Sequence, residues 1–376
     1  MELDSVASLF EENFKRFGEI GAAVSIWQNE RSILELHGGF RDANRNLQWK
    51  EDTIVLFWSA TKGLGSACLL HVLQERQIAL TRRVADFWPE FGQAGKAEIT
   101  LDQLLSHQAG LCALDLSADV LDYPAVIAAL EKQSPLWPPG MAHGYHARTF
   151  GFLLDELMRR IEGKTISDYW RTTFAEPLGL DVWIGLPESQ NGRAATVYAA
   201  KADKSPEPKQ FYADLATPGT LARKVFTSPH GLNSVSGMNV PKVRAQSFVS
   251  FAGIGNATSL AKFYAMLANG GELDGRAFFK EETIRQMTTI LVSGNDRVFQ
   301  IPTAFSAGFM KDPPETKRRL FGPSPLAFGH PGAGGSHAFA DPEHGISFAY
   351  VMNQMEQSVL PNDKSLRLVE AIYSLL

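Results

Sequence analysis

The sequence predicts an α+β fold, in which an antiparallel sheet is flanked by N- and C-terminal helices and a mainly helical subdomain is inserted between the two halves of the sheet. Two observations predict this class. The chain begins with an amphipathic helix pattern and two strand-like runs, and it ends with two strand-like runs and another amphipathic helix pattern. Between these ends, apolar residues recur mostly at helical spacing from residue 60 to about residue 180. Because a helix buries its apolar stripe by packing on another layer, the two ends are expected to form one layered unit.

The first helix is predicted by apolar residues that recur at intervals of three and four and share one stripe: Val6, Leu9, Phe10, Phe14 and Phe17. Two short strand-like runs follow at residues 22–27 and 33–36. The polar segment between them, residues 29–32, is typical of a hairpin connection. We therefore expect a hairpin covered by the first helix.

The C-terminal end repeats these elements in reverse order. Residues 335–340 and 346–352 predict a second strand pair, because the intervening sequence DPEHG has turn chemistry. The final helix is predicted by a second apolar stripe, formed by Leu366, Val369, Ile372 and Leu376.

The predicted sheet domain comprises residues 1–75 and 250–376, and the predicted mainly helical domain comprises residues 76–249. Together they are expected to form one unit. Residues 201–256 are richer in Pro, Ser, Gly and Lys and show weak periodicity. This stretch is expected to form long loops rather than a linker between independent domains.

Composition and charge exclude several classes of protein. The chain has 36 basic and 41 acidic residues, and its formal net charge of -5 argues against nucleic acid as a partner. Its two cysteines do not make a disulfide framework, so reduced thiols are expected. No run approaches the ~18 apolar residues of a membrane span, and the N-terminus is acidic where a secretory signal is basic. We expect a cytoplasmic protein that binds neither nucleic acid nor membrane; these patterns do not encode its oligomeric state.

A pattern with chemical potential begins at Ser59, which lies three residues before Lys62 at the start of a predicted helix. Residues i and i+3 share one helical face, so these side chains are expected to be neighbours. A serine hydroxyl becomes a nucleophile when a nearby base accepts its proton, and a lysine is such a base when burial or charge lowers its pKa. Backbone N–H groups of a first helical turn can also stabilise an oxyanion.

The Ser-x-x-Lys tetrapeptide alone is a weak signal, because the same spacing recurs at Ser259 and Lys262. The second pair lies in an amphipathic helix pattern without other support, so ordinary surface and core positions are expected for it.

His143 and His146 have a spacing found in metal sites, yet neighbouring glycines argue against the helix that this spacing requires. Neither a metal nor a cofactor is expected.

Four further segments, in order along the chain, support the first pair. Residues 101–111 read LDQLLSHQAGL, and residues 137–147 read WPPGMAHGYHA. Residues 256–271 read NATSLAKFYAMLANGG, and residues 329–336 read GHPGAGGS. With the tetrapeptide, these segments resemble the ordered motifs of the class C β-lactamase-like serine hydrolases, closest to the family VIII carboxylesterases. The resemblance covers most of the chain and implies the penicillin-binding, transpeptidase-like fold.

The resemblance implies roles for individual residues. Ser59 would be the nucleophile, Lys62 its partner, and Tyr145 the group that passes the proton to the leaving atom. The backbone N–H groups of Ser59 and Ala333 would form the oxyanion hole. Substrate contacts would come from His330 and Gly332, the alternative for His330 being a hydrogen-bonded structural histidine. Trp58 and Trp137 flank the motifs and either line an acyl or alcohol pocket, as substrate contacts, or pack in the core. Whether Lys62 or Tyr145 takes the serine proton stays open, because a neutral lysine and a phenolate are both competent bases.

Two departures from the family pattern concern the substrate. Ala147 replaces the asparagine of the Tyr-x-Asn motif, whose amide contacts the substrate in β-lactamases. His330 replaces the lysine of the Lys-Thr-Gly motif and removes a permanent cation that would bind a carboxylate. Both departures favour neutral short-chain esters, so the expected activity is that of a carboxylesterase with a serine acyl-enzyme intermediate. The alternatives are a β-lactamase or D,D-peptidase, and a catalytically inactive binding relative.

Overall fold

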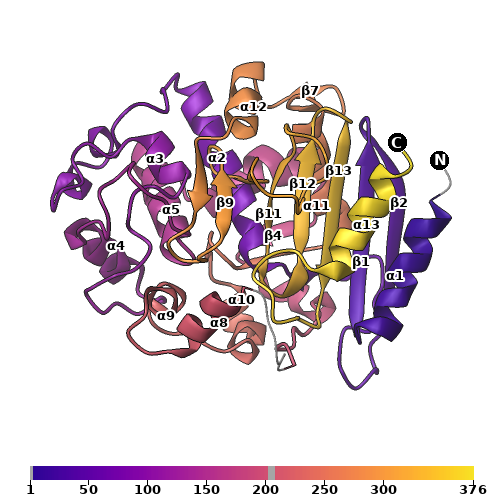
Figure 1. The fold of residues 1–376 in the computed structure, drawn as a ribbon. Coiled ribbons are helices and arrows are strands. Elements are labelled where there is room, and N and C mark those ends of the chain that lie inside the picture. The colour runs from indigo at the N-terminus through magenta and orange to yellow at the C-terminus, as the bar shows by residue number, and fades with distance from the viewer. Residues whose placement is uncertain (1–2, 202–207) are drawn as a thin grey trace.

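The computed structural model describes residues 3–201 and 208–376 and has the α+β fold that the sequence predicts. At its centre lies an eight-stranded antiparallel sheet in the order β2-β1-β13-β12-β11-β10-β9-β8 (Figure 1). The strands are β1 (Gly21–Gln28), β2 (Arg31–Gly39), β8 (Val292–Asn295), β9 (Pro302–Phe305), β10 (Met310–Lys311), β11 (Phe328–Pro331), β12 (His337–Asp341) and β13 (Ile346–Met352).

Strand β1 joins the two ends of the chain, because it pairs with β2 on one side and with β13 on the other, where Val24 lies opposite Tyr350. Both predicted hairpins are present. In the first hairpin, Asn29 and Glu30 have φ values of 47° and 67°. Positive φ at both central residues matches the right-handed twist of the paired strands, which is why this tight turn joins them.

The two faces of the sheet carry side chains of different size. Large side chains such as Tyr350 face helices α1 (Asp4–Arg16) and α13 (Asp363–Tyr373), which pack against each other. Small side chains such as Ala349 face helix α11 (Ala257–Ala268), which therefore approaches the sheet closely. The predicted terminal helices are confirmed, but the prediction that Leu376 shares the buried stripe is wrong, because it lies beyond α13 and is 48% exposed.

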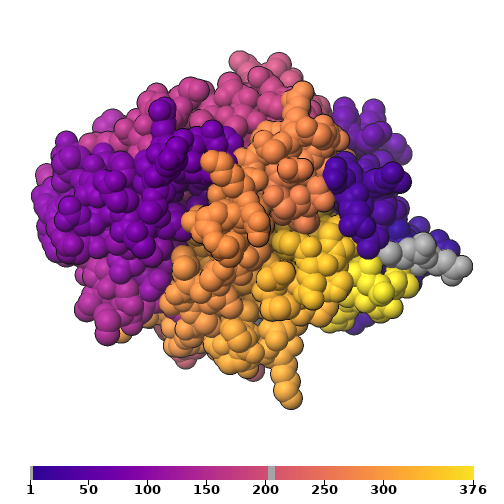
Figure 2. Space-filling model, turned by 90° about the horizontal axis from the view of Figure 1, so that it is seen from above, coloured from indigo at the N-terminus to yellow at the C-terminus, as the bar shows by residue number. Residues whose placement is uncertain are grey.

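Helix α2 (Thr61–Glu75) is buried on nearly all sides and packs against α5 (Thr149–Glu162) and α6 (Ile166–Trp170). Around these lie α3 (Leu101–Leu105), α4 (Tyr123–Lys132) and α7 (Glu176–Leu178), while α12 (Glu281–Thr288) contacts α2 from the C-terminal half of the chain. Figure 2 shows the arrangement from above, with the purple and magenta helical part on one side and the indigo and yellow chain ends on the other. Helix α2 therefore connects the sheet to the helical part.

A small sheet that the sequence does not predict lies at the start of α2. Its strands, in the order β3-β5-β4, are β3 (Val55–Leu56), β5 (Gly253–Gly255) and β4 (Val182–Ile184). A separate hairpin consists of β6 (Glu272–Leu273) and β7 (Arg276–Ala277). The small sheet matters for function because β3 leads directly into Ser59.

The expectation of long loops over residues 201–256 is wrong in part. The described portion contains α8 (Lys209–Ala216), α9 (Leu221–Thr227) and α10 (Pro241–Arg244), and residues 202–207 lie outside the described residues. These helices have 8, 7 and 4 residues, so none is long enough for an apolar repeat to stand out in the sequence.

Both cysteines, Cys68 and Cys112, are free and buried, as expected. None of the helices in residues 3–201 and 208–376 combines the length and the apolar character that a membrane crossing requires.

Candidate active site

Ser59 lies in a 3₁₀ turn (Trp58–Ala60) between β3 and α2, and it is partly exposed. The turn is held by the small sheet: the Phe57 N–H donates to the Gly253 carbonyl at 3.0 Å, and the Gly253 N–H donates to Thr61 Oγ1 at 2.7 Å. Trp58 has a φ of 50°, in the left-handed region that a bulky residue rarely adopts. This strained backbone places the Ser59 side chain at the opening of the helix.

Lys62 is completely buried, and its Nζ has three neighbours. Nζ lies 3.2 Å from Ser59 Oγ, 2.9 Å from the Ala147 carbonyl oxygen and 2.8 Å from the Ser250 carbonyl oxygen. Burial lowers the pKa of Lys62 well below its usual value, and among the described residues no carboxylate opposes that effect. A neutral amine has two N–H donors and one lone pair. With both N–H groups directed at carbonyls, the lone pair faces the Ser59 hydroxyl.

Lys96 provides an internal comparison, since it is also completely buried. Its Nζ donates to the carbonyl oxygens of Gln93, Glu131 and Gln133 at 2.9, 2.8 and 2.7 Å. Three acceptors match the three donors of an ammonium group. At Lys62 a hydroxyl replaces the third carbonyl, and only a hydroxyl can donate its proton back to the amine.

Tyr145 is 3% exposed and lies beside both residues. Lys62 Nζ is 4.8 Å from the centroid of its ring, and the ring of Phe299 stacks on that of Tyr145 at a centroid distance of 4.7 Å. Burial raises the pKa of the phenol, and a hydrogen bond with Ser59 opposes this shift only in part. Tyr145 is therefore a neutral phenol at physiological pH and can donate a proton.

The end of β11 closes the site from the sheet side. A Cβ on Gly332 would lie 2.1 Å from the Phe57 carbonyl oxygen, so only glycine permits this close approach to the Ser59 turn. Across the described residues, neither the backbone N–H of Ser59 nor that of Ala333 has a hydrogen-bond acceptor. These are the two N–H groups that the resemblance implies for an oxyanion hole. Gly332 thus brings the strand end and the helix start together.

His330 is 1% exposed, and its ring lies 5.9 Å from that of Tyr145. Nδ1 lies 2.8 Å from the Pro331 carbonyl oxygen, so Nδ1 carries the hydrogen and Nε2 is an acceptor. Burial is the main cause that lowers the pKa of His330 to about 3. The imidazole is therefore neutral and offers no cation to a substrate carboxylate.

The other aromatic and histidine candidates differ in their contacts. Trp137 is buried and donates from Nε1 to the Gln108 carbonyl at 3.3 Å, whereas Trp58 is only partly buried. His146 uses both ring nitrogens, accepting from the Leu111 N–H at 2.9 Å and donating to the Gly144 carbonyl at 2.8 Å. His143 instead contacts Thr303 Oγ1 at 2.9 Å. The two histidines therefore serve different partners.

The second Ser-x-x-Lys pair has structural contacts. Ser259 Oγ accepts from the Asp181 N–H at 2.9 Å, and Lys262 pairs with Asp274 at 2.9 Å.

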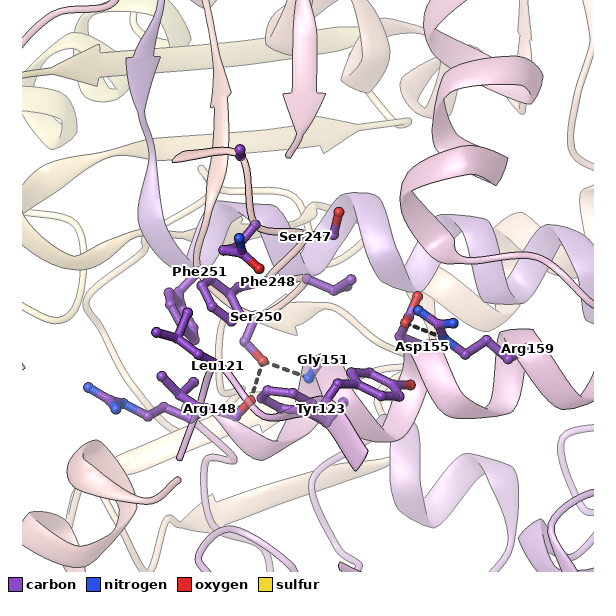
Figure 3. A pocket seen from close by; sticks show the side chains of 15 residues that line it. Leu121, Tyr123, Arg148, Gly151, Asp155, Arg159, Ser247, Phe248, Ser250 and Phe251 are labelled. Atoms are coloured by element: carbon purple, nitrogen blue, oxygen red, sulfur yellow. Dashed lines mark hydrogen bonds and ion pairs between the residues drawn. The ribbon is translucent and has the colours of Figure 1, made fainter. Parts of the chain in front are cut away.

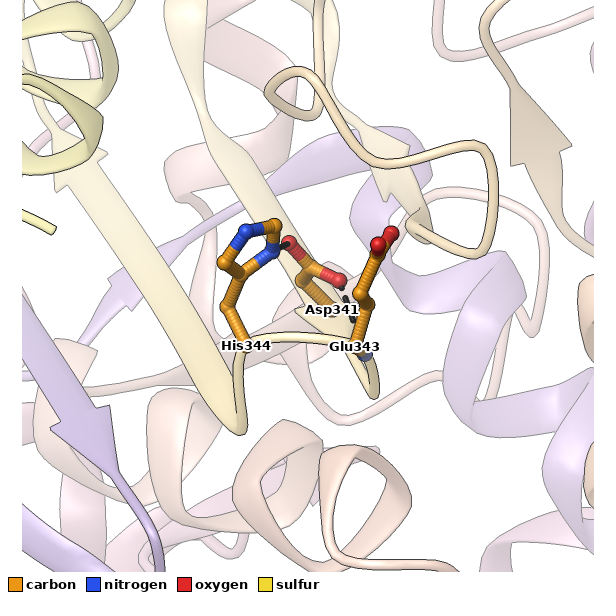
Figure 4. A group of neighbouring side chains, drawn as sticks. All are labelled: Asp341, Glu343 and His344. Carbon is orange, nitrogen blue, oxygen red and sulfur yellow. Dashed lines mark hydrogen bonds and ion pairs between the residues drawn. The ribbon is translucent and has the colours of Figure 1, made fainter.

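The side chains of Asp341, Glu343 and His344 also converge (Figure 4). Asp341 accepts from the Tyr373 hydroxyl at 2.6 Å and lies 2.8 Å from His344 Nδ1, contacts that account for this cluster as part of the β12-β13 turn.

A pocket of ≈ 230 Å³ adjoins the backbone that holds Lys62 (Figure 3). Ser250 forms part of its wall, where its Oγ donates to the Arg148 carbonyl at 2.8 Å and accepts from the Gly151 N–H at 2.6 Å. Ser59, Lys62 and Tyr145 are not among the residues that line the pocket. It is therefore separate from the serine hydroxyl.

Sequence reasoning missed three residues of this site: Ser250, Asp296 and Phe299. Ser250 acts through its backbone carbonyl, which leaves no signature in the sequence. Asp296 precedes a turn, and its Oδ1 accepts hydrogen bonds from backbone N–H groups. The only sequence signal of this role is an aspartate at the start of a turn, and aspartates are common at that position.

Comparisons with known proteins show that the chain is similar to them in sequence and fold over most of its length. A solved penicillin-binding protein homologue from Caulobacter crescentus is 36% identical, with 100% of this chain and 97% of that chain covered and a TM-score of 0.88. A solved family VIII carboxylesterase is 35% identical, with 100% and 98% covered and a TM-score of 0.87. The esterase/beta-lactamase LipL of Mycobacterium tuberculosis is 30% identical, over 93% of this chain and 80% of LipL.

The sequence model of the beta-lactamase family matches residues 9–371, which include the Ser59 turn, Tyr145 and the β11 strand end. Because this match runs through both the sheet and the helical part, and because the fold agrees with solved relatives over the whole chain, the chain belongs to the beta-lactamase family.

Proposed function

We propose that the protein is a serine carboxylesterase that hydrolyses short-chain carboxylic esters through an acyl-enzyme on Ser59. The observation that carries the proposal is the buried amine of Lys62, 3.2 Å from Ser59 Oγ, with its two other contacts made to carbonyl oxygens. A solved relative described as a family VIII carboxylesterase, at 35% identity, and LipL, described as an esterase/beta-lactamase, at 30% identity, support the reaction class.

In the first half-reaction, Lys62 accepts the Ser59 proton while Oγ attacks the ester carbonyl carbon. The carbonyl oxygen becomes an oxyanion, stabilised by the N–H groups of Ser59 and Ala333. When the intermediate collapses, the C–O bond to the alcohol breaks and Tyr145 donates its proton to the leaving oxygen. The proton held by Lys62 restores the phenol, so the step releases a neutral alcohol.

In the second half-reaction, water attacks the acyl-enzyme and gives its proton to Lys62. The bond between Ser59 Oγ and the acyl carbon then breaks, and the serine oxygen regains a proton. The products are a carboxylic acid and the starting enzyme. Neither half-reaction requires a metal or a cofactor.

Two features of the site favour neutral esters. The side chain of Ala147 has no amide. The backbone carbonyl oxygen of Ala147 already accepts a hydrogen bond from Lys62 Nζ. His330 is neutral, because burial lowers its pKa to about 3. A penicillin or a peptide stem carries an amide and a carboxylate that would use those missing groups, whereas a simple ester carries neither.

The first expected result is a substrate preference. The kcat/KM for p-nitrophenyl butyrate is expected to exceed that for a chromogenic cephalosporin by about a hundredfold or more, since two absent polar contacts correspond to roughly 3 kcal/mol. Initial rates over p-nitrophenyl esters from acetate to decanoate, with the cephalosporin alongside, provide the measurement. A preference for the cephalosporin would establish a β-lactamase instead, and failure to be labelled by a fluorophosphonate probe would indicate an inactive relative.

The second expected result is a pH profile with an acidic limb set by Lys62. Since burial lowers the pKa of Lys62, the basic amine is present above that pKa and is lost as the pH falls through it. His330 does not set the limb near neutral pH, because its pKa is about 3. We expect kcat/KM, measured between pH ~4 and ~9, to give the same limb position in His330→Gln as in wild type. A limb that moves in this variant would assign the titration to His330.

A further inference from the structure

Asp296 is a completely buried carboxylate located between β8 and β9. Its Oδ1 accepts from the backbone N–H groups of Val298 at 2.7 Å, Phe299 at 2.9 Å and Tyr145 at 3.3 Å. Its Oδ2 lies 3.2 Å from the Thr303 hydroxyl. Burial raises the pKa of Asp296, and the backbone N–H donors oppose that shift, because donors stabilise the ionised carboxylate.

The same turn carries the aromatic ring that supports Tyr145. Phe299 stacks on the Tyr145 ring at a centroid distance of 4.7 Å and an interplanar angle of 24°. The backbone of the turn also contacts the segment before Tyr145, since the Arg297 N–H donates to the His143 carbonyl at 3.0 Å. Asp296 therefore holds Tyr145 at two points, by its backbone N–H and, through Phe299, by its ring.

A chain of two hydrogen bonds connects the Asp296 carboxylate to His143 through Thr303. Thr303 Oγ1 donates to Asp296, so it accepts from His143 Nε2 at 2.9 Å. His143 is itself buried. The segment 143–145, the turn 297–299 and strand β9 therefore converge on one carboxylate. Many buried polar groups thus hold a turn that contacts Tyr145.

We propose that Asp296 is a positioning residue of the esterase reaction, which orients the Tyr145 phenol towards Ser59. The inference depends on the proposed function, because it assumes that Tyr145 passes a proton. An orientation error of about 1 Å at a reacting group can cost up to ~100-fold in rate without a comparable loss of substrate affinity. Asp296 acts through Tyr145 and does not itself contact the reacting atoms.

The test is a double-mutant cycle between Asp296→Asn and Tyr145→Phe, with p-nitrophenyl butyrate as substrate. Asparagine keeps an oxygen for the backbone N–H groups but removes the second acceptor. In the wild-type background we expect Asp296→Asn to lower kcat about tenfold and to leave KM within about twofold. In the Tyr145→Phe background the same change is expected to cost less than about twofold, because the hydroxyl that it positions is already absent.

Asp312 supplies a matched control, since its carboxylate also accepts from backbone N–H groups, those of Leu320 at 2.7 Å and Phe321 at 3.0 Å. Asp312→Asn is expected to lower the thermal midpoint but not kcat per folded molecule. If Asp296→Asn does not fold, Phe299→Leu keeps the carboxylate and enters the same cycle. An equal cost of the substitution in both backgrounds, or no loss of kcat, would overturn the inference. If Tyr145→Phe alone has no effect, the proposed proton transfer fails instead.

Discussion

Ser59→Ala is expected to lower kcat for p-nitrophenyl butyrate by on the order of a million-fold, because no acyl-enzyme can form without the serine oxygen. The fold is expected to survive the change. The Ser59 side chain contacts Lys62 and Tyr145 but caps no helix, and the turn around it is held by the Phe57, Thr61 and Gly253 contacts. Rates and thermal midpoints of both proteins, with contaminating esterase excluded, provide the measurement.

Ser259→Ala is the matched control, since Ser259 also precedes a lysine by three residues and lies in a helix. Its hydroxyl accepts from the Asp181 N–H, so the variant is expected to lose about 1 kcal/mol of stability and to keep the wild-type kcat. More than a few percent of wild-type turnover in Ser59→Ala would contradict the assignment of the nucleophile.

The parts of the fold that could be predicted are those with local periodicity. The stripe of Val6 and Phe10 and the strand pair at β12 and β13 are each encoded within a short stretch of sequence. The pairing of β4 with β5 could not be predicted, because both strands are short and one of them reads Gly-Ile-Gly. Such strands acquire their partners from the tertiary structure and carry no alternation of their own.

The candidate site shows the same limit. The spacing of Ser59 and Lys62 predicts their proximity, since one helical turn connects them. Lys62 also contacts the backbone carbonyl oxygens of Ala147 and Ser250. Every residue type has a backbone carbonyl, so these contacts leave no pattern in the sequence. Burial raises the pKa of Tyr145 and lowers that of Lys62, which favours Lys62 as the base in the proposed mechanism.

Lys62→Met and Tyr145→Phe are each expected to lower kcat by at least about 100-fold, because each removes part of the path by which the serine proton reaches the leaving oxygen. Methionine fits the buried space of Lys62 better than alanine, since it keeps the volume of the side chain and leaves no cavity. Phenylalanine keeps the stacking on Phe299 and removes only the hydroxyl. Steady-state kcat for p-nitrophenyl butyrate is the measurement.

Lys96→Met is the control for the lysine, because Lys96 is also completely buried among carbonyl oxygens but serves no hydroxyl. This variant is expected to lose stability, since three carbonyls lose their donor, and to keep kcat per folded molecule.

The double variant Lys62→Met with Tyr145→Phe decides whether the two groups act together. A common proton path predicts a combined loss far smaller than the product of the single losses, because breaking the path once already stops the transfer. Fully multiplicative losses would mean that Lys62 and Tyr145 contribute independently, and the mechanism would then need a different proton donor for the leaving alcohol.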